Sequence, residues 1–267
     1  MFMEKLKTAA KAAREFIVRR KGAFAAVAAV GAAACMFYIV SAPVFVGASA
    51  TERVLPIYRV VRDNKSVSLT FDMSYGSEDT HYIIEALARY GVRATFFVVG
   101  EWAQEHPDAV LALHEAGHEI MNCSDSYPHL SRLTADEIRA EAEACSDTVE
   151  ALTGVRPTLF RCPYGEYDDN VISTLKQIGL IAVQWDVDSL DWKGLSASEI
   201  TNRVVSKVKN GSIILMHNNS DNILDALRLT LSRLKVQGYK ITSVSDLVYN
   251  EGYTIDRNGI QHKLKGE

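Results

Sequence analysis

The chain divides into a long apolar run near its start and a remainder in which short apolar stretches alternate with amphipathic ones. Residues 23–50 contain no charged side chain, and this length exceeds the ~20 residues that a helix needs to cross a bilayer. From residue 67 onward, short apolar runs are followed by segments in which apolar positions recur at helical spacing. This second pattern is typical of strands that alternate with helices.

The alternation predicts about seven strand and helix units. The predicted strands cover residues 67–71, 94–99, 119–120, 159–160, 181–185, 212–216 and 239–242. The predicted helices cover residues 80–90, 106–116, 134–153, 169–178, 197–208, 223–237 and 244–249. Glycines such as Gly91 and Gly154 follow these helices where a left-handed cap residue belongs. Because little chain is left over, we predict an α/β fold with parallel strands in a closed or nearly closed β/α barrel, with its site at the strand ends.

The apolar run is preceded by a basic segment. Its basic residues are Lys5, Lys7, Lys11, Arg14, Arg19, Arg20 and Lys21. A basic flank predicts a cytoplasmic N-terminus, so we expect a single-pass anchor in the cell membrane and a domain outside the cytoplasm. The small-residue pattern Ala48-Ser49-Ala50 leaves open cleavage after Ala50 and secretion. We favour the anchor because the run is longer than the ~7 to 15 residues of a signal-peptide core.

We therefore expect five segments along the chain. Residues 1–22 form a basic cytoplasmic segment, and residues 23–50 form a transmembrane anchor or signal segment. Residues 51–65, which Pro56 interrupts, are expected to be a stalk. Residues 66–249 form the folded domain, and residues 250–267 form a polar tail.

Composition and cysteine content narrow the function classes. The chain is 48% hydrophobic and 23% charged with a net charge of -4, which is typical of a folded protein and provides no basic field for nucleic acid. Of its four cysteines, Cys35 lies in the apolar run, which leaves Cys123, Cys145 and Cys162 in the exported part. An odd number outside the cytoplasm indicates that no disulfide framework organises the fold.

Polar side chains follow four of the predicted strands at their carboxyl ends. Asp72 follows the first strand, Arg161 follows the fourth, Asp191 comes shortly after the fifth, and His217 follows the sixth. One such residue is more often a cap or a surface group, but repetition at four strand ends favours a common site. Two carboxylates, an arginine and a histidine in one site are typical of acid–base hydrolysis with an oriented histidine.

Five ordered motifs carry a family resemblance. They read SLTFD, GHEIMNCSDSYPHLSRLT, LFRCPYG, DVDSLDW and SIILMHN. In this order they resemble the motifs of the polysaccharide deacetylases, also known as the NodB homology domain or carbohydrate esterase family 4, and are most similar to the sporulation-type subgroup of Firmicutes. The resemblance covers about residues 66–249.

The resemblance implies a fold and an activity. The expected fold is an irregular (β/α)7-type barrel. The expected activity is hydrolysis of a carbon–nitrogen bond other than a peptide bond, which removes acetyl groups from N-acetylated glycans such as peptidoglycan or N-acetylglucosamine polymers. A divalent metal, zinc or similar, would polarise the amide carbonyl and acidify the attacking water.

The resemblance also assigns roles to individual residues. Asp72 lies at the position of the catalytic base and His217 at that of the general acid. Asp191 lies near the place of the carboxylate that orients this histidine, and Arg161 would restrain the base.

Three further residues match positions that contact substrate: Tyr164, Trp192 and Leu215. Tyr164 would border the oxyanion and the sugar, and Trp192 and Leu215 would line the acetyl pocket. Simple packing is an alternative interpretation for Tyr164, and a place in the core is one for Trp192.

The metal-binding half of the pattern departs from the family. The family has a second aspartate directly after the base, where this chain has Met73. It also has two histidines four residues apart in the second motif, where this chain has Cys123 and Tyr127. Since a metal site needs several donors in fixed geometry, these changes bear directly on the expected cofactor.

Two rearrangements could compensate for the lost ligands. Asp79, Cys123 and His129 offer oxygen, sulfur and nitrogen donors that suit zinc, although Asp79 is also placed to cap the helix that starts at residue 80. Alternatively, Cys123 and Cys162 could form a disulfide at the former metal position. A site without any metal is the remaining possibility.

Three functions follow from these alternatives. The first is a membrane-anchored deacetylase that acts on cell-wall or related glycans through a weak or rebuilt metal site. The second is an inactive relative that binds glycan or a partner at the cell surface. The third is an anchored scaffold in a spore or division complex.

Overall fold

The computed structural model describes residues 3–4, 7–8, 10–12, 14–15 and 54–264. The chain divides into two units, Met1–Thr51 and Glu52–Glu267. No helix among the described residues is both long and apolar enough to cross a membrane. The predicted anchor at residues 23–50 lies outside the described residues.

An eight-stranded sheet forms the centre of the second unit, in the order β6-β5-β4-β3-β2-β8-β7, with β9 beside the start of β2. Its strands are β2 (Ser66–Met73), β3 (Thr95–Val98), β4 (Glu119–Asn122), β5 (Leu159–Phe160), β6 (Ile181–Ala182), β7 (Val187–Asp188), β8 (Ile213–His217) and β9 (Lys240–Thr242). Every pairing in this sheet is parallel. All residues of β2 are buried, as is typical of a parallel strand that is covered on both faces.

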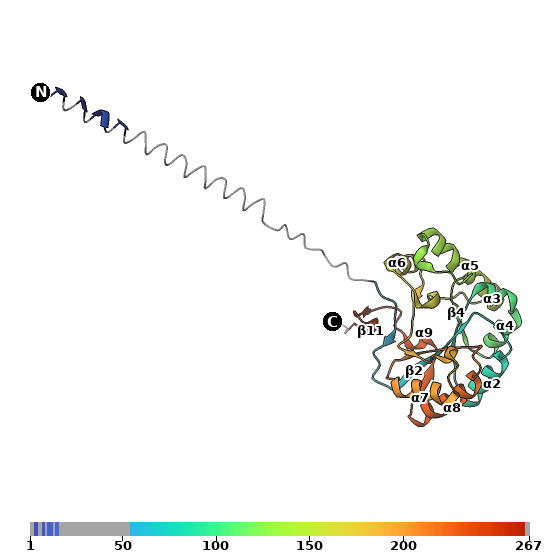
Figure 1. The fold of residues 1–267 in the computed structure, drawn as a ribbon. Helices are drawn as coiled ribbons and strands as arrows, with labels where there is room; N and C mark the ends of the chain where they lie inside the picture. The colour runs from blue at the N-terminus through green and yellow to red at the C-terminus, as the bar shows by residue number, and fades with distance from the viewer. Residues whose placement is uncertain (1–2, 5–6, 9, 13, 16–53, 265–267) are drawn as a thin grey trace. The chain divides into compact units, whose positions relative to one another are not determined.

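Helices surround the outside of the sheet (Figure 1). They are α2 (Thr80–Tyr90), α3 (Gly100–Glu105), α4 (Pro107–Glu115), α5 (Ala135–Thr153), α6 (Asp169–Gln177), α7 (Ala197–Lys207), α8 (Ile223–Val236) and α9 (Val244–Leu247). The predicted caps are confirmed at Gly91 (φ 63°) and Gly154 (φ 73°), whose left-handed backbone suits glycine. The predicted helix at residues 106–116 is confirmed as α4, which begins at Pro107, and it is preceded by a short helix that was not predicted, α3.

The parallel sheet forms a half-barrel, whereas a closed or nearly closed barrel was predicted. β6 and β7 are two residues each, and only residues 183–186 separate them, so no helix intervenes. Of the predicted strand at 181–185, only Ile181–Ala182 forms a strand. Among the described strands, β6 and β7 do not pair with each other. The opening is bridged by the start of the domain, where Ile57 pairs with Val183 and Arg59 pairs with Ser212.

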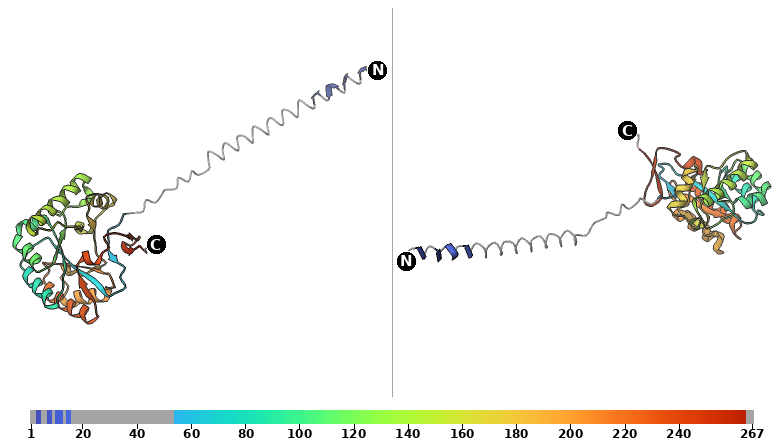
Figure 2. Two further views of the ribbon diagram at one scale, coloured as in Figure 1. Left: turned by 180° about the vertical axis from the view of Figure 1, so that it is seen from behind. Right: turned by 90° about the horizontal axis from the view of Figure 1, so that it is seen from above.

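Parts of the expected stalk and tail form a second, three-stranded sheet. It consists of β1 (Arg59–Val60), β11 (Ile260–Lys263) and β10 (Tyr253–Ile255). β1 runs parallel to β11, which forms an antiparallel hairpin with β10. Figure 2 shows these last strands beside the first residues of the domain. The expected stalk is part of the folded domain because Ile57 and Val60 are fully buried apolar residues, which a solvated stalk would expose.

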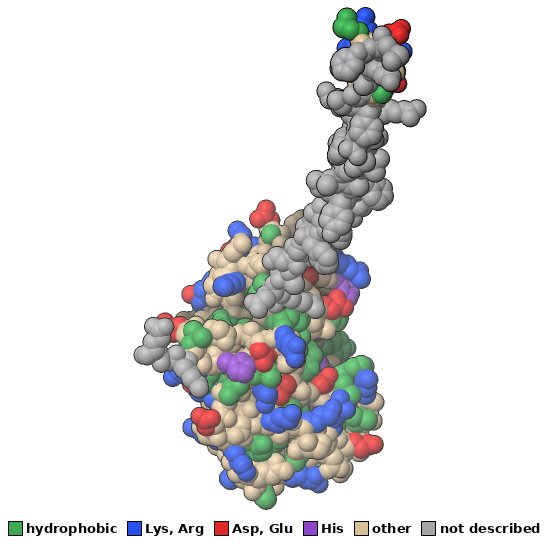
Figure 3. Space-filling model, turned by 90° about the vertical axis from the view of Figure 1, so that its left-hand side faces the viewer, with side chains coloured by type: hydrophobic (Ala, Val, Ile, Leu, Met, Phe, Trp, Pro, Cys, Tyr) green, Lys and Arg blue, Asp and Glu red, His purple; other side chains and the backbone are tan. Residues whose placement is uncertain are grey.

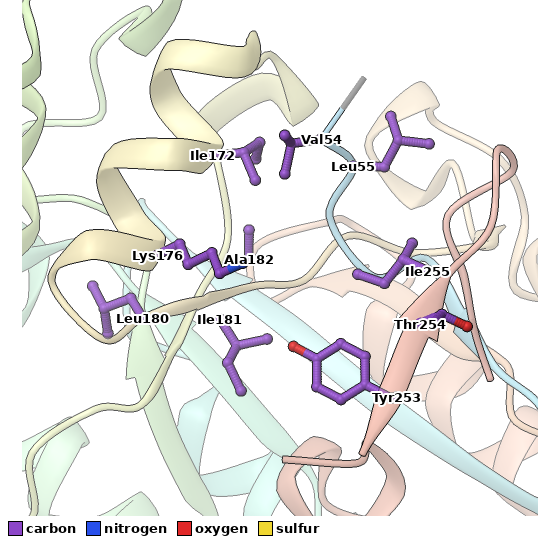
Figure 4. A pocket seen from close by; sticks show the side chains of 10 residues that line it. All are labelled: Val54, Leu55, Ile172, Lys176, Leu180, Ile181, Ala182, Tyr253, Thr254 and Ile255. Atoms are coloured by element: carbon purple, nitrogen blue, oxygen red, sulfur yellow. The ribbon is translucent and has the colours of Figure 1, made fainter. Parts of the chain in front are cut away.

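A pocket of about 330 Å³ lies beside this second sheet. Apolar side chains from α6, β6, β10 and residues 54–55 line it, with Lys176 and the Tyr253 ring at its edge (Figure 4). None of the predicted site residues lines this pocket. The face of the molecule on the left of Figure 1 mixes basic, acidic and apolar side chains (Figure 3).

Candidate active site

The first two predicted site residues lie side by side at the carboxyl ends of neighbouring strands. Asp72 is the seventh residue of β2, and His217 is the last residue of β8. The two strands pair in parallel so that Asp72 and His217 are direct partners in register. The hydrophobic pattern of both strands therefore places a carboxylate and an imidazole at the same edge of the sheet.

Asp72 is held by a buried arginine. The Arg161 guanidinium donates to Asp72 Oδ1 at 2.8 Å, to Thr70 Oγ1 at 2.8 Å and to the Gln184 carbonyl at 3.2 Å. Arg161 is fully buried, and its guanidinium carbon lies 4.0 Å from the centre of the Phe97 ring. A buried charge pair of this kind keeps the Asp72 carboxylate in one position, and loss of either partner would leave an uncompensated charge.

His217 is held by Asp191 in the loop after β7. Asp191 Oδ1 lies 2.7 Å from His217 Nδ1, and Asp191 Oδ2 accepts from the His217 backbone N–H at 2.8 Å. Burial alone would lower the pKa of His217, but the hydrogen bond and charge of Asp191, together with the charge of Asp72, raise it above its usual value. The ring is therefore fixed in orientation and held in a state that favours the imidazolium.

Non-glycine residues with positive φ occur in the loops around these pairs. They are Ser124 (φ 65°), Tyr127 (φ 58°), Tyr164 (φ 58°) and Leu190 (φ 53°). Each lies in a loop that follows one of the strands β4, β5 or β7. Such conformations are unfavourable for L-residues and persist only where the surroundings hold them, commonly at functional sites. The strain thus points to the same edge of the sheet as the two charge pairs.

The predicted substrate residues differ in accessibility. The Tyr164 and Trp192 side chains are exposed, with relative exposures of 54% and 61%, whereas Leu215 is buried in β8. Tyr164 packs against the Tyr127 ring at a centroid distance of 4.7 Å and stacks on the His129 ring at 4.6 Å. Exposed aromatic rings beside polar groups are suited to contact with a ligand, and exposure argues against a core role for Trp192.

Sequence reasoning missed Tyr75, which lies in the loop after β2. Its side chain is 74% exposed, and its carbonyl accepts from Asn218 Nδ2 at 3.1 Å. Asn218 directly follows His217, so the loop that carries Tyr75 is fastened beside the two charge pairs. The available signal was a tyrosine between the first motif and the next helix, which is too common a feature to single out.

Comparison with known proteins decides the family. The family model for polysaccharide deacetylase matches residues 59–183. The peptidoglycan-N-acetylglucosamine deacetylase of Bacillus cereus is 35% identical over 185 residues, which cover 68% of this chain and 67% of that protein. The chain belongs to the polysaccharide deacetylase family. The predicted resemblance is confirmed.

Solved structures show both the fold and its variation within the family. The wild-type BA3943 protein of Bacillus anthracis, described as a CE4 family pseudoenzyme, is 31% identical with a TM-score of 0.71, covering 78% of this chain and 73% of that one. A mutant of BA3943, described as having restored enzymatic activity, is 33% identical with the same TM-score, covering 73% of this chain and 72% of that one. Polysaccharide deacetylases similar to this chain therefore include a pseudoenzyme.

Met73, Cys123 and Tyr127 are the residues that the sequence resemblance places at the family's metal-ligand positions. Met73 and Cys123 are fully buried and belong to the hydrophobic core. Burial, with a further contribution from Asp72, raises the pKa of the Cys123 thiol well above its usual value. Burial and the nearby Cys123 and Asp72 likewise raise the pKa of the Tyr127 phenol. A neutral thioether is a poor ligand for zinc, and a thiol and a phenol must lose a proton to bind it, which burial disfavours here, so these three side chains do not fit the family's metal.

The rebuilt zinc site is wrong for this structure. Among residues 54–264, no three histidine, cysteine, aspartate or glutamate residues form a group that could hold a metal ion. The His129 Nδ1 atom lies 2.7 Å from Glu166 Oε2, and the His129 ring stacks on the Tyr164 ring. Asp79 occupies the N-cap position of α2, but its side chain makes no capping hydrogen bond.

The Cys123–Cys162 disulfide is also not formed. Cys123, Cys145 and Cys162 are all buried free thiols. Cys145 donates its S–H to the Val98 carbonyl at a sulfur–oxygen distance of 3.3 Å, which satisfies it within the core. These cysteines therefore act as small apolar core residues.

Proposed function

We propose that this chain binds an N-acetylated glycan at the strand-end site without hydrolysing it. The observation that carries the proposal is the set of neutral side chains, Met73, Cys123 and Tyr127, at the positions where the family has one carboxylate and two imidazoles. Hydrolysis of an amide needs an activated water and a polarised carbonyl. A thioether, a thiol and a phenol at these positions neither activate water nor polarise a carbonyl as a bound metal would.

Glycan binding is supported by features that do not depend on a metal. Tyr75, Tyr164 and Trp192 expose aromatic rings in loops that follow β2, β5 and β7. Aromatic rings provide flat apolar surface at little cost in conformational entropy, and polar groups beside them fix orientation. The peptidoglycan deacetylase of Bacillus cereus is named for a glycan substrate, which favours a cell-wall glycan as the ligand class.

The retained charge pairs have a structural explanation under this proposal. Arg161 is fully buried and lies against Asp72, and Asp191 is buried against His217. Loss of one partner would leave a buried charge alone, which is strongly destabilising. These residues would thus persist as a hydrogen-bond network after the chemistry was lost.

The same pairs favour hydrolysis as a second candidate function. A fixed carboxylate and an oriented imidazole with a raised pKa are the groups that a base and a general acid require. Under this alternative, Asp72 and His217 take the roles that the family resemblance implies. No step is assigned to a metal, because the available donors do not fit one.

We further propose that the domain is held outside the cytoplasm at the cell membrane. The support is the uncharged run at residues 23–50 with its basic flank. Cleavage after Ala50 would instead release the domain. N-terminal sequencing of the protein recovered from membranes and from culture medium separates the two.

The proposed function is tested with the full chain. Isothermal titration with N-acetylglucosamine tetramer measures binding, and acetate release is followed with added zinc, cobalt or nickel. Binding without acetate release supports the proposal. Acetate release by the wild-type protein supports the hydrolase alternative and overturns the proposal, and so does an absence of binding. The ligand-restored variant, Met73→Asp with Cys123→His and Tyr127→His, serves as the comparison for activity.

A further inference from the structure

The loop after β4 is built to hold one side chain, that of Tyr127, in a fixed place. Asn122 is fully buried, and its Oδ1 accepts from the Ser124 backbone N–H at 2.7 Å. Ser124 Oγ then accepts from the Tyr127 backbone N–H at 3.1 Å. Both Ser124 and Tyr127 have positive φ. This conformation is unfavourable for L-residues, and the two hydrogen bonds stabilise it.

The other end of the same loop is fixed from α5. Glu141 Oε2 accepts from the backbone N–H groups of Asp125 at 3.0 Å and Ser126 at 2.9 Å. Glu141 Oε1 accepts from Ser126 Oγ at 2.8 Å. The conformation of the loop is therefore set before any ligand arrives, which lowers the entropy lost on binding.

The Tyr127 phenol lies against Tyr164, in the loop that follows β5. Its oxygen accepts a long hydrogen bond, 3.5 Å, from the Tyr164 backbone N–H, and its ring packs edge-on against the Tyr164 ring. Burial, followed by the nearby Cys123 and Asp72, raises the pKa of the Tyr127 phenol. Within residues 54–264 the hydroxyl donates no hydrogen bond. The Tyr127 phenol is therefore held beside the exposed Tyr164 ring with its hydroxyl hydrogen available to a ligand.

We propose that the Tyr127 hydroxyl donates a hydrogen bond to the acetyl carbonyl of a bound N-acetylated sugar and so selects N-acetylated over free-amine glycan. This inference rests on the proposed function, since it names the chemical group by which the proposed glycan site recognises its ligand. In the family the metal, held by histidines, would polarise the acetyl carbonyl; a phenol at one of these positions can donate a hydrogen bond to that carbonyl directly but cannot activate water. The site then recognises the family's substrate group without the family's cofactor.

The charges around the phenol act in the same direction. The Asp72 carboxylate is already paired with the buried Arg161, and His217 is held toward its cationic form by Asp191. A free-amine sugar carries an ammonium group, and the Asp72 and Asp191 carboxylates that could attract it are already paired with Arg161 and His217. A neutral acetamide does not depend on such a partner.

The test compares two ligands and two variants of the full chain. Isothermal titration is carried out with N-acetylglucosamine tetramer and with glucosamine tetramer. Tyr127→Phe removes only the hydroxyl and keeps the ring contact, and Tyr253→Phe, in β10, is the matched control. We expect the wild-type protein and Tyr253→Phe to prefer the N-acetylated tetramer by at least about tenfold, and Tyr127→Phe to lose about fivefold to tenfold in affinity for it alone.

The outcomes separate this inference from the function on which it rests. Equal affinity of Tyr127→Phe and wild type for the N-acetylated tetramer overturns the role of the hydroxyl and leaves glycan binding intact. A wild-type protein that prefers the amine tetramer also overturns the inference, and this comparison needs no variant to fold. If neither tetramer binds to wild type, the proposed function itself fails.

Discussion

Replacement of Arg161 by methionine tests whether the acid–base pairs persist for stability. Methionine keeps much of the side-chain volume against Phe97 but removes the charge and the hydrogen bonds to Asp72, Thr70 and the Gln184 carbonyl. The Asp72 carboxylate, which is 4% exposed, is then left in the core without its partner. Breaking a buried ion pair in this way costs about 3–5 kcal/mol.

A second variant separates the charge effect from simple loss of packing. In Asp72→Asn with Arg161→Met, the group left behind is a neutral amide, which costs only about 1–3 kcal/mol when it is unsatisfied. The double variant should therefore be more stable than Arg161→Met alone. If the two sites were independent, their costs would add, and the double variant would be less stable than Arg161→Met alone.

Urea unfolding followed by tryptophan fluorescence measures both effects. With a slope of about 3 kcal/mol per molar urea for a domain of this size, the Arg161→Met cost corresponds to a midpoint lowered by about 1–1.7 M. The double variant should recover part of this shift. A midpoint within about 0.3 M of wild type for Arg161→Met, or a double variant less stable than the single one, would refute the reasoning and leave chemistry as the explanation for the pair.

Four other outcomes are expected. The ligand-restored variant should bind zinc and release more acetate than wild type, as measured by metal analysis and an acetate assay. A variant without bound zinc would contradict the inference that Met73, Cys123 and Tyr127 are what prevent metal binding. Because the folded pKa of His217 is raised, its pair with Asp191 should stabilise the fold fully below about pH 6.5 and less as the pH rises through the folded pKa; Asp191→Asn should abolish this dependence in pH-resolved melting curves. In a Cys35→Ser background, the three buried thiols should react with a maleimide only after denaturation, and labelling of the native protein would contradict their burial. Thr134→Ala should cost about 1 kcal/mol in urea unfolding by removing the capping box of α5, and an unchanged midpoint would count against that cap.

The acid–base residues could be predicted from sequence because their placement depends on strand periodicity alone. Asp72 and His217 end apolar runs, and parallel strands bring their carboxyl ends to one edge. The capping box that starts at Thr134 is local as well, so the start of α5 could be predicted to within one residue. Strand periodicity and helix capping can both be recognised in a single sequence.

The neighbourhood of the lost ligands could not be predicted, because it depends on how loops pack. The inward position of Tyr127 requires positive φ at two non-glycine residues, held by a buried asparagine and a glutamate from a distant helix. Similarly, Cys123 and Cys162 follow neighbouring strands, yet their thiols stay unpaired in the core. Sequence spacing placed these residues near each other but could not give the direction of each side chain.

The pairing of β1 with β11 also makes folding of the domain depend on its last residues. Arg59 and Ile260 are partners in register, so about two hundred residues must be synthesised between the two halves of one contact. Contacts of such sequence separation form late, because a large loop must close before they contribute. As the chain is synthesised, the segment that bridges the open side of the half-barrel cannot pair with β11 until β11 has been made. Until then the apolar side chains of Ile57 and Val60 remain exposed to chaperones or to aggregation.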